Sequence, residues 1–232
     1  MPTPTLRPLR SAASEADSGR SCATRLIFWD WNGTLLDDAA YAIGVRNRSF
    51  PAFGLPTIDS MAEYRAQFTF PVREYYRRAG VTDDIFVPVA HAWMGEYLRG
   101  CHALSLFGDA REALGRFAAA GMRQVVLSAS KLDTLRYQLF LAGVAHRFDA
   151  VLGLTDIYAA SKTAIGRRYL TAIDEPPAAC VMLGDTLHDA QVASELGCRC
   201  VLVARGHQDK QTLLTAGVPV VNSLTAAAEL LL

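Results

Sequence analysis

The 232-residue sequence has no excess of charge of either sign. Lysine plus arginine and aspartate plus glutamate both number 23, so no net positive field would draw the chain to nucleic acid or to a membrane surface. No segment approaches the ~20 consecutive apolar residues that are needed to span a bilayer. We therefore expect neither nucleic acid nor a membrane among its partners.

Two kinds of short motif are also absent. There is no C-x-x-C pair, which argues against a disulfide framework and against a zinc site, and a reducing cytoplasm fits this cysteine usage best. Neither G-x-G-x-x-G nor G-x-x-x-x-G-K-[ST] occurs, which argues against the common nucleotide-binding loops. The five scattered cysteines are Cys22, Cys101, Cys180, Cys198 and Cys200.

The first 23 residues differ in composition from the rest of the chain. They are rich in proline, serine, alanine and charged residues, and they lack the continuous apolar segment of a signal peptide. We expect residues 1–23 to form a disordered tail.

From Thr24 onward, short apolar runs alternate with longer amphipathic segments. Such alternation predicts an α/β fold with a doubly wound, Rossmann-like parallel sheet. We expect Asp109 to cap the helix that ends at Gly121, and two later helices to end at Gly143 and Gly197. The expected strands are RLIFW from Arg25, QVVLS from Gln124, DAVLG from Asp149, ACVMLG from Ala179, CRCVLV from Cys198 and VPVV from Val218.

Residues 39–105 are too many for an ordinary connection between the first two strands. The segment contains prolines that divide the predicted helices, and it contains enough aromatic residues for a core of its own. We therefore predict an inserted helical cap domain over residues 39–105, with the core domain formed by residues 24–38 and 106–232. The aromatic residues are Phe50, Phe53, Tyr64, Phe68, Phe70, Tyr75, Tyr76, Trp93 and Tyr97.

Polar residues follow four of the expected strands. Ligands of open parallel sheets bind at the carboxyl ends of the strands, so these residues are expected to meet at one edge. Any one of them could be an ordinary cap or turn residue, but together they are what a site for phosphate and a divalent cation requires. They are Asp30, Ser128-Ala129-Ser130, Lys162 and Asp185 with Asp189.

In this order the residues resemble the motifs of the haloacid dehalogenase superfamily, in particular its phosphoglycolate-phosphatase-like branch with a helical cap. The first motif, D-x-D-G-T, corresponds to the segment from Asp30 to Thr34. The second is a Ser or Thr that ends a strand, here Ser128, and the third is a lysine, here Lys162. The fourth, G-D-x-x-x-D, corresponds to Gly184 through Asp189.

The resemblance implies a Mg²⁺-dependent phosphatase that acts on a small phosphorylated metabolite, with phosphoglycolate-like compounds or sugar phosphates as first candidates. Asp30 would be the nucleophile, because a carboxylate held in line with phosphorus can form an aspartyl-phosphate. Asp30, Asp185 and the backbone carbonyl of Asn32 would bind the metal, and Asp189 would complete the shell directly or through water.

The remaining motif residues would bind the phosphoryl group. Lys162 would neutralise the nucleophile and the transferring oxygens, while the Ser128 hydroxyl and the backbone amides that follow it, from Ala129 on, would hold those oxygens. In the cap, Arg46 and Arg73 are our candidates for binding a second anionic group of the substrate.

One position departs from the family pattern. The phosphatases usually carry an acid-base aspartate two residues after the nucleophile, and here that residue is Asn32. General acid-base help worth roughly 10²- to 10⁴-fold would then be missing. The leaving group could need little protonation, as in an acyl phosphate; another acid or water could act; or catalysis could be slow or absent. We favour an active, substrate-restricted phosphatase.

Two other functions stay open. Dehalogenases of the same family also lack the second aspartate, but they need no metal. This chain retains Asp185 and Asp189, which favours a site that binds a cation. A non-catalytic module that binds phosphate or a partner is the other alternative. His188 is expected to be a loop residue near the site, the other histidines show no metal-ligand spacing, and the protein is expected to be a monomer or a homodimer.

Overall fold

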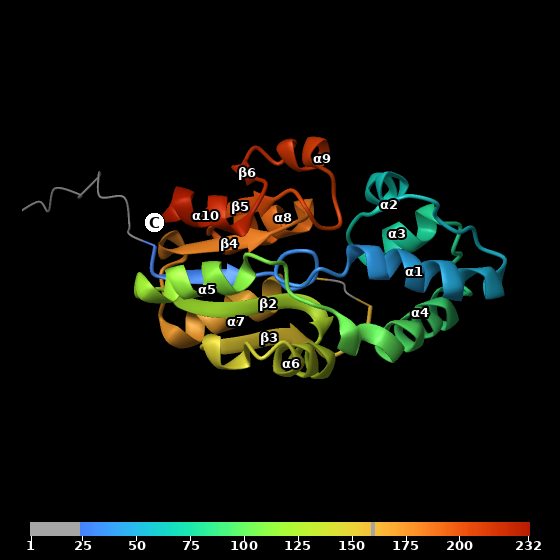
Figure 1. Cartoon of the computed structure of the whole chain (residues 1–232), viewed down its shortest axis with the longest axis horizontal. Helices are drawn as coiled ribbons and strands as arrows, with labels where there is room; N and C mark the ends of the chain where they lie inside the picture. The colour runs from blue at the N-terminus through green and yellow to red at the C-terminus, as the bar shows by residue number, and fades with distance from the viewer. Residues whose placement is uncertain (1–23, 159–160) are drawn as a thin grey trace, which may run out of the picture.

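The computed structural model describes residues 24–158 and 161–232. The tail predicted for residues 1–23 lies outside the described residues. Over the described ranges, a parallel six-stranded sheet runs in the order β3-β2-β1-β4-β5-β6 (Figure 1). The strands are β1 (Leu26–Trp29), β2 (Arg123–Lys131), β3 (Ala150–Leu154), β4 (Cys180–Gly184), β5 (Arg199–Val203) and β6 (Val220–Val221).

These six strands confirm the predicted sheet. The central strand β1 pairs on one side with β2 and on the other with β4, so that Trp29 is opposite both Val126 and Leu183. All four residues of β1 are buried, because helices cover both faces of the sheet. Fully burying a leucine, isoleucine or phenylalanine side chain stabilises the fold by roughly 1.5–3 kcal/mol.

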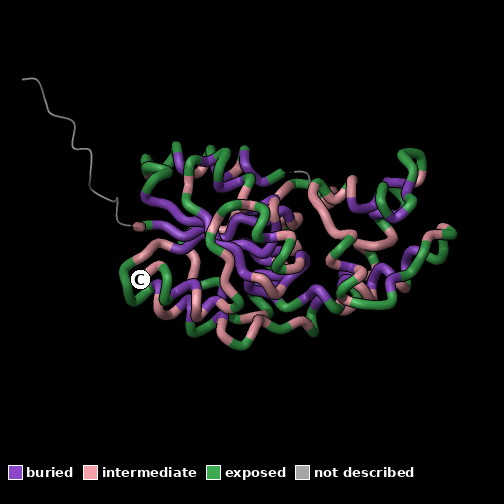
Figure 2. Tube along the Cα trace, turned by 90° about the horizontal axis from the view of Figure 1, so that it is seen from above, coloured by how far each residue is buried: buried purple, intermediate pink, exposed green. Residues whose placement is uncertain are grey.

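Helices pack on both faces, as in a doubly wound fold. Ile27 and Trp29 face a cluster with α5 (Ala110–Ala119), α6 (Leu132–Leu141) and α10 (Leu224–Leu231). Leu26 and Phe28 face a second cluster with α7 (Thr163–Ile173), α8 (Leu187–Leu196) and α9 (Lys210–Leu214). The four central strands β1, β2, β4 and β5 are accordingly mostly buried, the outer strands β3 and β6 are half-buried, and exposed positions fall mainly on helices and loops (Figure 2). Two short 3-10 turns lie at Ala145–Arg147 (η3) and Pro177–Ala179 (η4).

Asp109 is the N-cap residue of α5, but the expected capping by its side chain is wrong. The Asp109 side chain makes no capping hydrogen bond to its own helix. Its Oδ2 accepts hydrogen bonds from the backbone amides of Leu224 and Thr225 at the start of α10, and its Oδ1 pairs with Arg205. A tertiary contact with the last helix therefore replaces the local cap that the sequence favoured.

The segment between β1 and β2 is helical, and Figure 1 shows its first four α-helices gathered beyond the ends toward which β2 and β4 point. Buried aromatic side chains from these helices, including Phe50, Tyr64, Tyr75 and Tyr76, form a separate cluster. The division of the chain into core and cap domains stays a prediction. The helices are α1 (Ala39–Ser49), η1 (Phe50–Phe53), α2 (Met61–Gln67), α3 (Val72–Arg78), α4 (Phe86–Gly100) and η2 (Cys101–Ala103).

None of the helices in residues 24–158 and 161–232 combines the length and the apolar character that crossing a membrane requires.

Candidate active site

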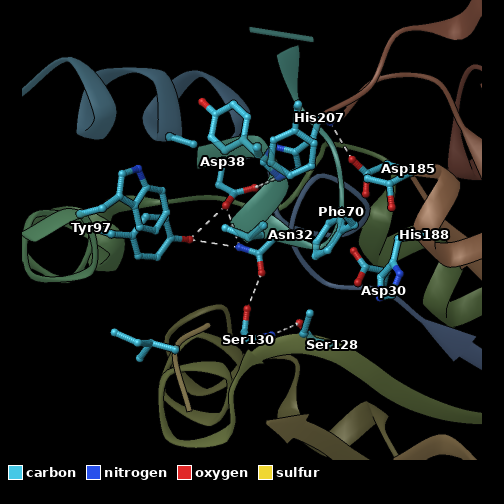
Figure 3. Close-up of a pocket in the computed structure, with 18 of the residues that line it drawn as sticks. Asp30, Asn32, Asp38, Phe70, Tyr97, Ser128, Ser130, Asp185, His188 and His207 are labelled. Carbon is cyan, nitrogen blue, oxygen red and sulfur yellow. Dashed lines mark hydrogen bonds and ion pairs between the residues drawn. The ribbon is translucent and has the colours of Figure 1, made fainter. Parts of the chain in front are cut away.

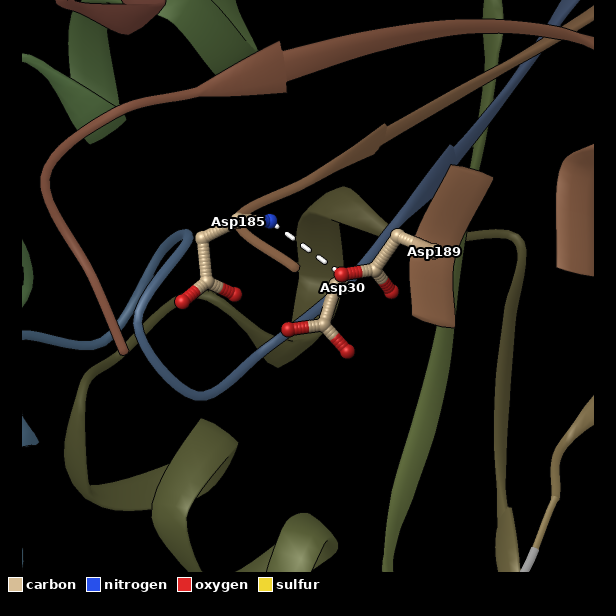
Figure 4. A group of neighbouring side chains, drawn as sticks. All are labelled: Asp30, Asp185 and Asp189. Carbon is tan, nitrogen blue, oxygen red and sulfur yellow. Dashed lines mark hydrogen bonds between the residues drawn. The ribbon is translucent and has the colours of Figure 1, made fainter. Parts of the chain in front are cut away.

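Three aspartates meet at the carboxyl edge of the sheet. Asp30 follows β1, Asp185 follows β4, and Asp189 lies in the first turn of α8. One oxygen from each carboxylate lies within 4.8 Å of the others, and all three residues are buried (Figure 4). Residues separated by more than 150 positions in the sequence are thus brought to one point because β1 and β4 are neighbours in the sheet.

Lys162, the N-cap residue of α7, points its ammonium at this group. Its Nζ forms ion pairs with Asp30 Oδ1 and, at 2.7 Å, with Asp189 Oδ1. The lysine is 1% exposed. Burial alone would lower the pKa of Lys162, but Asp189 and Asp30 raise it above the ordinary value, so the lysine is held in its charged form.

The carboxylates respond differently to burial. Burial is the largest influence on Asp30 and raises its pKa to about 8, with Asp189 and Asp185 adding repulsion against the attraction of Lys162. Burial likewise raises the pKa of Asp185 to about 6. Burial also acts upward on Asp189, but the ion pair with Lys162 outweighs it and lowers the pKa of Asp189. Three carboxylates and one ammonium carry a formal charge of −2 when all are ionised.

This donor set fits a hard divalent cation, which would cancel the two excess negative charges and which takes carboxylate oxygens as ligands. Glycines leave room for the Asp185 carboxylate. A Cβ on Gly33 or on Gly206 would lie 2.2 or 2.0 Å from Asp185 Oδ2. Thr34 Oγ1 donates to Asp185 Oδ1 at 3.1 Å and approaches Asp30 Oδ2 at 3.4 Å, which orients both carboxylates.

Asp189 has a structural role in addition to its charge. Its Oδ2 accepts hydrogen bonds from the backbone amides of Asp185 and Thr186 and from the Thr186 hydroxyl, and together with Thr186 it forms a capping box at the start of α8. Capping side chains of this type stabilise helix starts by about 1 kcal/mol. The residue therefore fixes the loop that carries Asp185.

The amide of Asn32 is held from both ends (Figure 3). Its Nδ2 donates to Asp38 Oδ2 at 2.7 Å and to the Tyr97 hydroxyl at 3.2 Å. Its Oδ1 accepts from Ser130 Oγ at 2.7 Å. The side chain that replaces the family's usual aspartate thus joins the first loop to β2 and to α4.

Asp38 and His207 form an ion pair that the sequence analysis missed. His207 Nε2 lies 3.3 Å from Asp38 Oδ1, its Nδ1 lies 2.8 Å from the Tyr64 hydroxyl, and its backbone amide donates to Asp185 Oδ2. Burial would lower the pKa of His207, but Asp38 raises it to about 9. The signal was available, because His207 follows β5 at the same carboxyl edge as the other site residues.

The residues expected to hold phosphate lie at the end of β2. Ser128 is buried, and its Oγ accepts a hydrogen bond from the backbone amide of Ser130 at 3.1 Å. Ser128, Ala129 and Ser130 line the same pocket as Asp30 and Lys162. The strand continues to Lys131, so that α6 starts directly after it.

The expectation for the two cap arginines needs correction, because neither residue lines the pocket. Arg46 is 1% exposed, and its guanidinium donates to Gln67 and to the Tyr75 hydroxyl inside the helical segment. Arg73 forms an exposed ion pair with Asp83 at 2.6 Å. Both cations already have partners away from the place where a substrate would lie.

His188 is close to the site, as expected, but it is part of α8 and not a loop residue. Its ring stacks on Phe70 with the centroids 4.6 Å apart and the planes at 15°. Within the part of the chain that the structure describes, its buried Nε2 has no hydrogen-bond partner. Burial lowers the pKa of His188, so the ring is neutral near pH 7.

The family is settled by comparison with known proteins. A model of the haloacid dehalogenase-like hydrolases matches residues 27–203, which include every motif residue from Asp30 to Asp189. The chain belongs to the haloacid dehalogenase-like hydrolase family, and it is therefore a hydrolase by descent.

Individual relatives are more distant. The chain is 26% identical to a phosphoglycolate phosphatase from Synechococcus elongatus over 82% of its own length and 88% of the relative's. It is also 26% identical to the tyrosine-protein kinase PtkA from Mycobacterium tuberculosis, over 85% of this chain and 66% of that one. A solved haloacid dehalogenase-like hydrolase from Streptococcus pneumoniae superimposes with a TM-score of 0.79 at 18% identity, over 90% and 99% of the two chains, which shows the shared fold.

Proposed function

We propose that this protein is a Mg²⁺-dependent phosphatase that hydrolyses a small phosphorylated metabolite through an aspartyl-phosphate on Asp30. The observation that supports the proposal most strongly is the group of three buried aspartates beside Lys162. With all three carboxylates ionised, the site has a formal charge of −2, which a divalent cation would cancel, and such an ion can also offset charge on a phosphoryl group. The similarity to a phosphoglycolate phosphatase supports the same reaction class.

Each side chain of the site would have a separate role in the reaction. A carboxylate oxygen of Asp30 attacks phosphorus, and the bond from phosphorus to the leaving oxygen breaks. Lys162 reduces the repulsion between the anionic nucleophile and the anionic phosphoryl group. Ser128 and the amides after it bind the phosphoryl oxygens and keep them in line. Water then attacks phosphorus, and Asp30 is released as a carboxylate.

Asp30, Asp185 and the backbone carbonyl of Asn32 would hold Mg²⁺, with Asp189 contributing directly or through water. When bound, the ion would neutralise charge on the phosphoryl oxygens. The side chain of Asn32 does not compete for this role, because its two polar atoms are already engaged with Asp38, Tyr97 and Ser130.

The two alternatives have less support. A dehalogenase uses its aspartate without a metal, so it would have no use for two further buried carboxylates beside the nucleophile. A module that only binds phosphate would need a cation and amides, and it would not need Asp30 to lie next to the lysine that can neutralise it. Neither alternative explains the full set of Asp30, Lys162, Asp185 and Asp189.

The proposal can be tested with purified protein, Mg²⁺ and a panel that contains 4-nitrophenyl phosphate, acetyl phosphate, phosphoglycolate and a 2-haloacid. We expect phosphate release that EDTA stops and that Asp30→Asn abolishes. Asp59→Asn, which alters an exposed carboxylate that is not among the pocket-lining residues, serves as the matched control and should retain activity. Halide release, or phosphate release that survives Asp30→Asn, would contradict the proposal.

A further inference from the structure

The pocket over Asp30 has a mainly aromatic wall on the side formed by the helical segment. Phe68 and Phe70 lie between α2 and α3, Tyr75 lies on α3, and Trp93 and Tyr97 lie on α4. The space they border measures about 1080 Å³ including its open mouth. Ligand pockets of this kind take their affinity from apolar contact and their specificity from few polar groups.

Two rings of this wall lie flat against rings of the core. Phe70 stacks on His188 at 4.6 Å between centroids, and Phe68 stacks on His207 at 4.8 Å with the planes at 24°. These contacts fix the orientation of both phenylalanines relative to the site. A planar guest gains about 0.5–1.5 kcal/mol from an offset-stacked or edge-on aromatic neighbour, in addition to the area that it buries.

The pocket offers little to a second anionic group. Among the described residues that line it, the lysines and arginines are Lys131 and Lys162 only. Lys162 is already paired with two aspartates. The side chain of Lys131 is 41% exposed and lies 3.8 Å from Asp133. The third cation of the lining, the buried His207, is paired with Asp38. A carboxylate or a second phosphate on the leaving group would therefore be desolvated without an unpaired buried cation to receive it, which is costly.

Proton supply is limited at the same place. Asn32 cannot ionise, and the groups around it are committed to one another. The Asp38 oxygens accept from the Gly33 amide, Asn32 Nδ2 and the Tyr97 hydroxyl, and both ring nitrogens of His207 have partners. Among the described residues, none of the side chains hydrogen-bonded to Asn32 is left free to protonate a leaving oxygen. His188, whose Nε2 has no partner, stacks on Phe70 and makes no hydrogen bond to Asn32.

A leaving group that departs without a proton solves this problem. A phenol has a pKa of about 10, whereas water, to which simple alcohols are close, has a pKa of about 15.7. A phenolate is therefore a far better unprotonated leaving group than an alkoxide. The aromatic wall and the missing acid are independent features, and both select the same kind of molecule.

We propose that the substrate of this site is a phosphate monoester of a phenol whose ring carries no charged group. This inference rests on the proposed phosphatase function and narrows its substrate class. An Asp30 oxygen bonds to phosphorus while the bond to the phenolic oxygen breaks, and the phenolate leaves with the electron pair and takes its proton from solvent. Water then cleaves the aspartyl-phosphate, and both of its protons end on the released phosphate.

Three matched esters separate the two features. Phenyl and benzyl phosphate share a ring, but only the first leaves as a phenolate. We expect kcat/KM for phenyl phosphate to exceed that for benzyl phosphate at least about 100-fold, the lower end of what a general acid supplies. 4-Carboxyphenyl phosphate adds one charge to the ring, and its kcat/KM should be about tenfold lower or worse than that of phenyl phosphate, a change of about 1.4 kcal/mol.

The wall is tested by Phe70→Ala, measured as the ratio of kcat/KM for phenyl phosphate to that for acetyl phosphate, which has no ring. The ratio should fall by up to about tenfold, and any general loss of folded protein cancels in it. Phe140→Ala removes a 74% exposed phenylalanine on α6 and should leave the ratio unchanged.

The outcomes distinguish this inference from the function beneath it. If benzyl phosphate or phosphoglycolate is hydrolysed as fast as phenyl phosphate, and Asp30→Asn still abolishes the reaction, the aryl preference is refuted while the phosphatase stands. If none of these compounds, acetyl phosphate included, is hydrolysed in an Asp30-dependent way, the phosphatase function fails and the substrate class fails with it.

Discussion

Replacing Asn32 by aspartate would place a second carboxylate in contact with that of Asp38. Asn32 Nδ2 lies 2.7 Å from Asp38 Oδ2, so the isosteric change Asn32→Asp puts an oxygen where a donor was. Asp38 is 2% exposed. The substitution restores the residue that related phosphatases carry, yet here the structure makes it unfavourable.

The size of the effect follows from two competing costs. Two unit charges at 2.7 Å repel by about 6 kcal/mol at an effective dielectric constant of about 20. Keeping one carboxyl protonated at pH 7 costs about 4 kcal/mol, because pH 7 lies about 3 units above an ordinary pKa of about 3.9 and each unit is worth about 1.36 kcal/mol. Protonation is cheaper, so the loss of stability is limited to about 4 kcal/mol at pH 7 and about 1.5 kcal/mol at pH 5.

The sign of the pH dependence is opposite to that of a buried carboxylate whose pKa is lowered by an ion pair. A carboxyl whose pKa is raised by folding binds more protons in the folded than in the unfolded state, so stability falls as pH rises. Urea unfolding of wild type and Asn32→Asp at pH 5 and pH 7 should show the difference growing by about 2–3 kcal/mol. Asn32→Ala is the control, since it removes the hydrogen bonds without adding charge and its effect should not vary with pH. An equal loss for Asn32→Asp at both pH values would refute the reasoning.

Three further predictions concern the surroundings of the site. Gly206→Ala would place a Cβ 2.0 Å from Asp185 Oδ2, and calorimetric titration should show Mg²⁺ affinity reduced about 10- to 100-fold. Asp38 raises the pKa of His207 to about 9 against the lowering effect of burial, so their pair stabilises the fold fully below pH 6.5 and loses this effect as pH rises through 9. His207→Gln should therefore cost at most about 3 kcal/mol in urea unfolding at pH 6 and much less at pH 10. Arg73→Ala should leave KM unchanged in steady-state kinetics.

Each of these predictions has a result that would contradict it. Gly108→Ala is the control for the glycine, because a Cβ there would meet nothing within 4 Å; equal affinities in the two variants would mean that Asp185 is not held as described. A cost of His207→Gln that is the same at both pH values would show that charge pairing with Asp38 does not stabilise the fold. A raised KM for Arg73→Ala would return this arginine to the substrate site.

The sheet and the convergence of Asp30, Lys162 and Asp185 could be predicted because both rest on a local signal. Apolar runs of strand length mark the sheet, and the polar residue after each run marks its carboxyl edge, where parallel strands bring their ends together. The roles of these residues in catalysis stay predictions until the experiments above are done.

What could not be predicted depends on contacts between distant elements. An arginine such as Arg46 is expected on the surface, but tertiary packing buries it against Tyr75. Asp109 stands where a helix cap is expected, yet it binds the start of α10. The pairing of Asp38 with His207 joins residues 169 positions apart, and no spacing rule connects them.

The central claim is that Asp30 receives the phosphoryl group beside a cation shared with Asp185. It is tested most directly by a crystal structure of the protein with Mg²⁺ and beryllium fluoride, which mimics a phosphoryl group on a carboxylate. The account predicts beryllium bonded to an Asp30 oxygen and Mg²⁺ at about 2.0–2.1 Å from oxygens of both Asp30 and Asp185. Beryllium on another residue, or Mg²⁺ bound away from these two carboxylates, would contradict it.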